Sequence, residues 1–245
     1  MGKLYTNDGK VLKTKDGRNF IVENNIPEFN IEKDINVTQE RYIVFLDIMG
    51  FKDRVARTEH NKLLEELNMF NSNISKHIKE HKEHGIELSQ FSDSILIYSS
   101  NSDIKSLEII SEVVSKVMRT SISSKIPLKG AIAKGTVTCD TIKQLYFGQA
   151  LIDAYLLEEN VKYYGVLAHN SVEADIKGIL KKGSTLFRDI DAPLKSGTVS
   201  HYEICWYNND VESAKENLNK IRETVSGDPR KYIDNSLKVI EIPNK

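Results

Sequence analysis

One apolar run constrains the fold of this chain more than any other feature of its sequence. The run Tyr42-Ile43-Val44-Phe45-Leu46 has no charged side chain and ends on Asp47. A continuous apolar run is typical of a strand that is covered on both faces. Apolar residues then recur at steps of three and four over residues 59–84, which predicts an amphipathic helix that stops at Gly85. The sequence therefore predicts a buried strand followed by a long helix that packs on its sheet.

The rest of the pattern completes an alternating order of strands and helices. The expected elements are two strands over 86–99 joined at 92–94, a helix over 104–124, a strand over 128–138 with a hairpin return at 144–147, a helix over 149–160, a strand over 164–168, a short helix near 171–180, a hairpin of 185–190 with 199–206, and a polar helix over about 209–224 before the tail. The leading β-α-β-β-α-β order is the split βαβ, or ferredoxin-like, pattern of the α+β class. It predicts one mostly antiparallel sheet with helices packed on one face.

The first residues follow a different pattern. Asn-Asp-Gly at 7–9 and Lys-Asp-Gly at 16–18 lie between short β-prone runs, and Asp-Gly pairs suit hairpin turns. We therefore expect an N-terminal arm of β-hairpins over residues 1–38. Residues 39–245 are then expected to form one catalytic domain that includes a C-terminal helix.

Composition excludes several classes of function. The 34 basic and 35 acidic residues give a net charge of −1, so no overall positive field attracts nucleic acid or an anionic membrane. The two cysteines, Cys139 and Cys205, are too few for a disulfide framework, which favours a reducing compartment. No apolar run approaches the roughly 18 residues of a membrane span, and the first ten residues lack the apolar segment of a signal peptide. We expect a cytoplasmic protein with no nucleic-acid or membrane partner.

Two acids at the expected strand ends indicate a metal site. In a split βαβ sheet the first strand is central and the hairpin after the first helix lies beside it, so Asp47 and Asp93 can face one point. An acid that ends a buried strand needs a partner to offset its desolvation, and Mg²⁺ or Mn²⁺ meets that need with oxygen ligands. Either acid alone is better explained as a helix cap or a turn residue. Together they favour a pair of ions that clamps a nucleoside triphosphate.

Neighbouring residues add candidate contacts to substrate. Residues 48–51, Ile48-Met49-Gly50-Phe51, turn from strand into helix and offer backbone N–H groups to phosphates beside the metal site. Phe45 and Ser94 lie on neighbouring strands and could line a base pocket, where an aromatic ring can stack on a pyrimidine. For Phe45 a plain core position is an equally good interpretation.

Four motifs resemble those of the class III nucleotide cyclases. Residues 45–51 resemble the first metal motif of the family, and Phe-Ser-Asp-Ser at 91–94 resembles the second. Residues 129–135 are similar to the strand that follows, and residues 147–154 resemble the start of the family's fourth helix. The resemblance spans about residues 41–206, and it is specific because the motifs occur in the family's order and spacing.

The bacterial pyrimidine cyclases of Pycsar anti-phage systems are the subgroup that this sequence resembles most, through residues 148–158 among others. This resemblance implies a homodimeric cytoplasmic cyclase that converts UTP or CTP to the 3′,5′-cyclic nucleotide and pyrophosphate. Its product would switch on an effector with a cyclic-nucleotide-binding domain, without direct contact between the two proteins.

The resemblance also assigns roles to residues. Asp47, Asp93 and the backbone carbonyl of Ile48 would hold two Mn²⁺ or Mg²⁺ ions, and the amides of residues 48–51 would hold the β- and γ-phosphates. Lys195 is similar in position to the family's phosphate lysine, although a solvated loop lysine explains it equally well. Tyr146 and Tyr155 are further candidates for the base pocket.

Departures from the family pattern keep alternatives open. Ile152 and Leu156 stand where the family has its transition-state Asn and Arg, and Ser89 and Leu145 stand where purine cyclases read adenine. An adenylate or guanylate cyclase is therefore disfavoured but remains an alternative. A catalytically inactive, cyclase-like nucleotide sensor is another. The choice between UTP and CTP stays open, with UTP favoured.

Overall fold

The computed structural model describes residues 2–3, 21–22, 37–208 and 210–241. The chain divides into two compact units, residues 1–36 and residues 37–245. In the first unit, β1 (Gly2–Lys3) pairs antiparallel with β2 (Ile21–Val22). The expected turns at 7–9 and 16–18 lie outside the described residues, so the assignment of residues 1–38 as an arm of hairpins stays a prediction.

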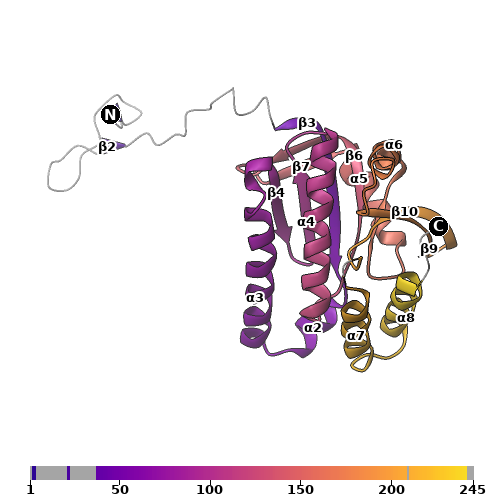
Figure 1. The fold of residues 1–245 in the computed structure, drawn as a ribbon. Helices are drawn as coiled ribbons and strands as arrows, with labels where there is room; N and C mark the ends of the chain where they lie inside the picture. The colour runs from indigo at the N-terminus through magenta and orange to yellow at the C-terminus, as the bar shows by residue number, and fades with distance from the viewer. Residues whose placement is uncertain (1, 4–20, 23–36, 209, 242–245) are drawn as a thin grey trace. The chain divides into compact units, whose positions relative to one another are not determined.

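The second unit is built on an eight-stranded sheet (Figure 1). Its strands are β3 (Thr38–Ile48), β4 (Ile86–Phe91), β5 (Ser94–Ser99), β6 (Leu128–Asp140), β7 (Leu145–Gly148), β8 (Val166–Ala168), β9 (Phe187–Leu194) and β10 (Gly197–Ile204). They follow the order β4-β5-β3-β6-β8-β10-β9, with β7 paired to β6, and the β6–β8 pair is parallel whereas the other pairs are antiparallel. Strands β3 to β6 have the predicted split βαβ order, β4-β5-β3-β6, in which β3 lies between β5 and β6.

Helices connect and cover these strands. They are α2 (Phe51–Arg57), α3 (His60–Lys79), α4 (Ile104–Ser123), α5 (Gln149–Asn160), α6 (Glu173–Leu180), α7 (Val211–Arg222) and α8 (Asp228–Glu241), with 3₁₀ turns η1 (Lys82–His84) and η2 (Asn170–Val172). The Glu59 side chain caps α3 by accepting from two backbone N–H groups, and Asp103 caps α4 by accepting from the N–H of Ser106. The chain leaves η1 through Gly85, whose φ of 71° favours glycine.

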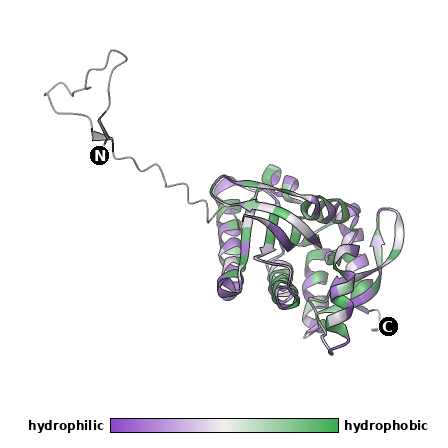
Figure 2. Cartoon of the chain, turned by 90° about the horizontal axis from the view of Figure 1, so that it is seen from above, coloured by the Kyte–Doolittle hydropathy of each residue, from purple (hydrophilic) through white to green (hydrophobic). Residues whose placement is uncertain are grey.

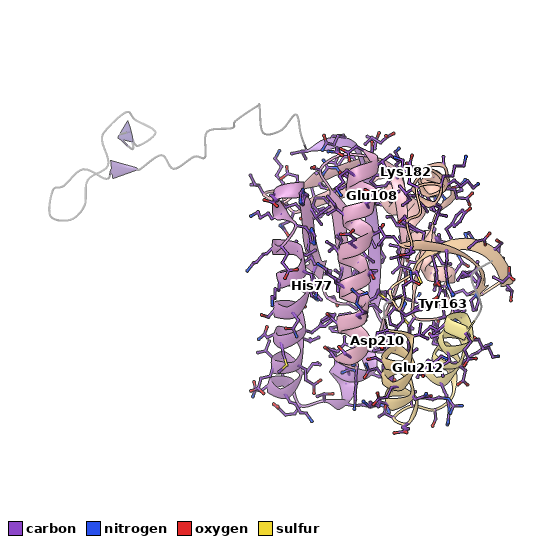
Figure 3. All side chains as sticks on the ribbon, in the orientation of Figure 1. His77, Glu108, Tyr163, Lys182, Asp210 and Glu212 are labelled. Carbon is purple, nitrogen blue, oxygen red and sulfur yellow. The ribbon has the colours of Figure 1, made fainter. Side chains whose placement is uncertain are left out.

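The two faces of the central strand have different neighbours. On one face, Tyr42, Val44 and Leu46 are buried in the core that α3 and α4 cover. These two helices run side by side (Figure 1), and His77 of α3, labelled in Figure 3, lies 3.0 Å through its Nε2 from Thr120 Oγ1 of α4. Figure 2 shows the same layers from above.

The prediction that all helices pack on one face is wrong, because α5 covers the opposite face. Its Ala150 and Ala154 pack on Ile43 in a second buried cluster. The small side chains allow the close approach, since a Cβ on Gly135 of β6 would already lie 3.4 Å from the Cβ of Ala150. Gly148 fixes the start of α5, because it has a φ of 149° and a Cβ there would lie 2.5 Å from the Thr136 carbonyl oxygen.

The C-terminal segment also differs from expectation. The predicted polar helix corresponds to α7, but a further helix, α8, occupies what the sequence suggested was a tail. Its apolar face buries Ile233, Val239 and Ile240. Ser236 interrupts this face in the sequence, yet it is buried and accepts from the backbone N–H of Tyr164 at 2.8 Å.

A buried polar network ties the β9–β10 hairpin to the body of the sheet. Arg188 Nε of β9 donates to Glu203 Oε1 of β10 at 2.9 Å, and Tyr163 donates its hydroxyl to Glu203 Oε2 at 2.8 Å. Tyr207 donates to Oε1 at 2.5 Å, and Arg188 also donates to the Val239 carbonyl of α8. Tyr163 is labelled beside α8 in Figure 3. A buried ion pair is tolerated only when such additional hydrogen bonds satisfy it.

We expect Arg188→Met to destabilise the protein by about 3–5 kcal/mol, because it leaves the Glu203 carboxylate buried without its cation. The matched control is Arg222→Met, which removes the ion pair between Arg222 and Asp234. The side chains of these two residues are 38% and 40% exposed. That pair should contribute less than about 1 kcal/mol. Urea denaturation of both variants measures the difference, and equal losses would contradict a structural role for the network.

Candidate functional site

The structure brings Asp47 and Asp93 together at the ends of two adjacent strands, β3 and β5. Asp47 lies one residue before the end of β3 and pairs in register with Ser94, the first residue of β5. Asp93 immediately precedes Ser94, and its carbonyl accepts from the backbone N–H of Ile48 at 2.9 Å. Both acids are half-buried. The two candidate metal ligands therefore come from adjacent strand ends, as the topology predicted.

Asp47 carries an electrostatic conflict. Burial, followed by the negative charges of Glu158 and Asp93, raises the pKa of Asp47 to about 6, while Lys129 acts in the opposite direction. A carboxylate in this position is costly to ionise because both its desolvation and its neighbours oppose the charge. A divalent cation beside Asp47 and Asp93 would relieve that conflict.

Sequence reasoning missed a buried ion pair next to Asp47. Lys129 of β6 pairs in register with Asp47, so the two side chains point to the same face of the sheet. Its Nζ lies 2.5 Å from Glu158 Oε1 of α5 and donates to the Glu158 carbonyl at 2.9 Å. The side chains of Lys129 and Glu158 are only 8% and 4% exposed. The available signal was a lysine directly after Leu128 and before the small and apolar run of residues 130–133, since a buried lysine requires a partner.

The remaining candidates lie around the same face. Phe45 is half-buried, and its ring lies edge-on to that of Tyr155 of α5, with centroids 5.5 Å apart. Ser94 is half-buried beside Asp47. Lys195 is exposed on the β9–β10 turn, and its charge acts to lower the pKa of Glu158, so it belongs to the same group of charges.

The resemblance would place purine-reading residues at positions 89 and 145, which are occupied here by Ser89 and Leu145. Ser89 of β4 donates its hydroxyl to the Tyr146 hydroxyl of β7 at 3.0 Å, and the Tyr146 ring lies 6.4 Å from that of Tyr98. Leu145 is exposed and offers no hydrogen-bonding side chain. This region of the sheet therefore presents phenol groups in place of a lysine and an aspartate.

The loop after Asp47 has fewer available amides than the sequence suggested. The N–H groups of Ile48 and Met49 already donate to the carbonyls of Asp93 and Pro127, both at 2.9 Å. Gly50 begins the helix with a φ of 75° and no side-chain cap, and a Cβ on it would meet nothing within 4 Å. Two of the four amides predicted to bind phosphate, those of Ile48 and Met49, are therefore already occupied.

The donor set fits a divalent ion only when a substrate completes it. No group of three or more His, Cys, Asp or Glu side chains is placed to hold a metal within residues 37–208 and 210–241. The candidate site offers two carboxylates and the Ile48 carbonyl. Mg²⁺ is commonly held by one or two carboxylates with phosphate oxygens and waters as its other ligands, so the set suits an ion that binds together with a nucleotide.

Several large apolar side chains of β4, β7 and α5 are exposed. Phe91 at the end of β4 is 85% exposed, Phe147 is 56% exposed, and Ile152 and Leu156 of α5 are each 51% exposed. Ile152 and Leu156 are the positions at which the resemblance would place Asn and Arg. Because Ile152 and Leu156 are four residues apart on one helix, they lie next to each other, and adjacent exposed apolar residues are typical of an interaction surface.

No helix in the described part of the chain is long and apolar enough to cross a membrane. No protein-family model matches the sequence, and no curated protein sequence matches it.

Solved structures do match the fold. The catalytic core of a rhodopsin-guanylyl cyclase with converted specificity, in complex with ATPαS, has a TM-score of 0.53 at 16% identity, covering 69% of this chain and 98% of that one. The guanylate cyclase domain from Catenaria anguillulae in complex with GTP has a TM-score of 0.54 at 15% identity, covering 68% and 96%. The non-canonical dimeric guanylyl cyclase domain from the aquatic fungus Blastocladiella emersonii has a TM-score of 0.54 at 15% identity, covering 68% and 97%.

These neighbours are class III nucleotidyl cyclase domains. The similarity confirms the predicted α+β, split βαβ architecture. The second unit of this chain therefore has the class III nucleotide cyclase fold.

Proposed function

We propose that this protein is a nucleotide cyclase that converts a pyrimidine nucleoside triphosphate, UTP or CTP, to its 3′,5′-cyclic nucleotide and pyrophosphate. The observation that carries the proposal is the meeting of Asp47 and Asp93 at adjacent strand ends within a class III cyclase fold. Two structural neighbours hold GTP and an ATP analogue, which supports a nucleoside triphosphate as the substrate class. The UTP preference is part of the proposal.

The reaction forms one bond and breaks one. The ribose 3′-oxygen gives up its proton to solvent water and attacks the α-phosphorus, and the bond between the α-phosphorus and the bridging oxygen breaks to release pyrophosphate. Mn²⁺ or Mg²⁺, bound as a pair, would supply charge neutralisation and would acidify the 3′-hydroxyl. Such a reaction depends mainly on positioning and on electrostatic stabilisation.

This chain's residues have distinct roles in the proposal. Asp47, Asp93 and the Ile48 carbonyl hold the two ions. We assign the β- and γ-phosphates to the amides of Gly50 and Phe51, and the exposed Lys195 supplies a positive charge that acts on Glu158. Lys129 is held at its place opposite Asp47 by Glu158, so its charge is already balanced before substrate binds.

Pyrimidine selection is proposed from the changed base-reading positions. A serine bonded to a tyrosine replaces the long lysine of purine cyclases, so this region holds a bulky ring where a purine would extend. Tyr146 and Tyr155 offer hydroxyl groups, and Phe45 and Ser94 complete the candidate wall of the base pocket.

The exposed apolar residues of α5 support a homodimer. In water these side chains are costly to leave uncovered as a group, and a second copy of the chain would cover them. One of the structural neighbours is a dimeric cyclase domain. By its resemblance to Pycsar cyclases, the protein would act in the cytoplasm in anti-phage defence, and its product would reach the effector by diffusion.

The first test is product identification. Purified protein is incubated with each of the four ribonucleoside triphosphates and Mn²⁺, and products are separated by mass-resolved chromatography. We expect cyclic UMP or cyclic CMP with equimolar pyrophosphate. Cyclic AMP or cyclic GMP as the main product would favour the purine alternative, whereas binding of a triphosphate without any cyclic product would favour the sensor.

A second prediction separates catalysis from folding. Asp47→Asn and Asp93→Asn should each lower turnover by about 100-fold or more, because each removes a charged ligand from the metal ions that would neutralise the reacting phosphates. Asp189→Asn, on β9 away from the site, is the matched control and should keep full turnover. Retention of full activity in either site variant would contradict the metal assignment.

The same Asp47→Asn variant should be more stable than the native protein when metal is absent. Because the pKa of Asp47 is raised to about 6, its charge costs stability above that pH. Removing the charge should raise the melting temperature at pH 8 by about 2–4 °C, which is the effect of ~1 kcal/mol in a chain of this size after allowance for solvent screening. The gain in melting temperature should shrink as pH falls through 6. It should vanish below about 4, where the Asp47 carboxyl is protonated in both the folded and the unfolded protein. Differential scanning calorimetry with a chelator measures it, and an unchanged melting temperature at pH 8 would contradict the conflict at Asp47.

A further prediction concerns assembly. The double substitution Ile152→Glu and Leu156→Glu should convert a dimer to a monomer and lower turnover, because it places charges in the proposed interface. Leu64→Glu on α3, where the side chain is 48% exposed, is the control and should leave the dimer intact. Size-exclusion chromatography with light scattering gives the mass, and an unchanged mass in the double variant would place the interface elsewhere.

A further inference from the structure

A large cavity lies on the other face of the sheet from Asp47 and shares Met49 and Gly50 with the loop of the candidate site. It has a volume of about 1000 Å³ and lies between α2, the C-terminal end of α4 and the α7–α8 pair. Four of its wall residues, Phe70, Ile126, Tyr164 and Ile221, belong to the core cluster on the α3–α4 face of the sheet, opposite to the face that carries Asp47. Figure 1 shows α2 and α7 at the same end of the sheet. The volume is at the upper end of the range that encloses a small ligand.

One wall of the cavity is a pair of stacked aromatic rings. The rings of Tyr164 and Tyr232 lie 6.0 Å apart with an angle of 21° between their planes. Tyr232 comes from α8, the helix that the sequence pattern did not reveal, and Tyr164 precedes β8. Because flat aromatic faces favour stacking with another ring, this wall suits a planar aromatic molecule.

The basic residues that line the cavity differ in whether they have an acidic partner. Two arginines have acidic partners, since Arg54 lies 3.4 Å from Glu66 and Arg57 lies 3.9 Å from Asp53. Both partners also line the cavity.

Two lysines of the same wall differ from these arginines. Lys125 and Lys162 have no carboxylate within 4.0 Å in the part of the chain that the structure describes. Lys162 donates to the Tyr232 hydroxyl at 3.0 Å and lies 5.1 Å from the centre of that ring. The lining also contains Asp228, at the start of α8. Lys162 therefore places a positive charge beside the aromatic wall, where it is bonded to the neutral phenol of Tyr232.

We propose that this cavity binds a small planar aromatic molecule that carries one anionic group. The ring of the ligand packs beside Tyr164 and Tyr232, and its anion pairs with Lys162. Met49 and Gly50 form part of the same wall, so a bound ligand also contacts the loop that follows Asp47 and Ile48. The binding step itself does not depend on the proposed cyclase activity.

The test compares two fluorescent probes on the full-length protein. 8-Anilinonaphthalene-1-sulfonate carries a planar naphthalene ring and one sulfonate, and N-phenyl-1-naphthylamine is the same molecule without its sulfonate. We expect the sulfonate probe to bind saturably to one site, about fivefold or more tightly than the neutral probe, because only the former pairs with Lys162. Equal affinities of the two probes would overturn the proposal.

Variants then locate the site. Lys162→Met should remove most of the preference for the sulfonate probe. Lys177→Met is the matched control, since Lys177 also lies over a tyrosine ring, that of Tyr202, at 6.0 Å, but outside the cavity. The control should keep the preference, and an equal loss in both variants would overturn the assignment to Lys162.

A cavity-filling variant keeps the test decisive if Lys162→Met weakens the docking of α8. Val225→Trp places a large side chain in the cavity wall and should weaken both probes about tenfold by occupying the space. Circular dichroism melting verifies that each variant is folded. Undiminished binding of both probes to folded Val225→Trp would show that they bind elsewhere and would refute the cavity as the site.

Discussion

The register of β3 between β5 and β6 is the constraint on which the rest of the structure depends. It sets Asp47 opposite Ser94 on one side and opposite Lys129 on the other. Because side chains alternate along a strand, a slip of one residue would turn Asp47 into the α3–α4 core and expose that core's apolar side chains. The apolar face of β3 therefore fixes the candidate site, since the burial of Leu46 and Ile48 leaves Asp47 pointing to the α5 face.

The site that this register creates is electrostatically unfavourable without a ligand. Asp47 is desolvated and lies near two other acids, whereas Lys129, its cross-strand neighbour, is already paired with Glu158. A fold selected for stability alone would replace such an acid with an uncharged residue. Conflicts of this kind are concentrated at functional sites, where a ligand supplies the missing charge.

Different helices cover the two faces of the sheet. On the α3–α4 face, apolar side chains form a buried core. Helices α7 and α8 also contribute to this core, and they line a large cavity together with aromatic, basic and acidic side chains. On the α5 face the small residues Ala150 and Ala154 bring one helix close to the sheet, while Ile152 and Leu156 on the same helix stay exposed. One helix thus seals its own side of the sheet and presents an apolar surface for a second copy in the proposed dimer.

The sequence by itself determined the order of the elements from Tyr42 to the β9–β10 hairpin, and the placement of Asp47 and Asp93 at strand ends, because these follow from local periodicity and turn residues. It did not determine the position of α5, since nothing local shows that Ala150 must pack on Ile43 across the second face. Nor did it reveal α8, whose Ser236 interrupts the apolar pattern and is satisfied only by the backbone N–H of Tyr164. The Lys129–Glu158 pair likewise joins a strand to a helix 29 residues later. Only the tertiary structure decides such contacts, because a buried charge or hydroxyl is stable only with a partner from a distant part of the chain.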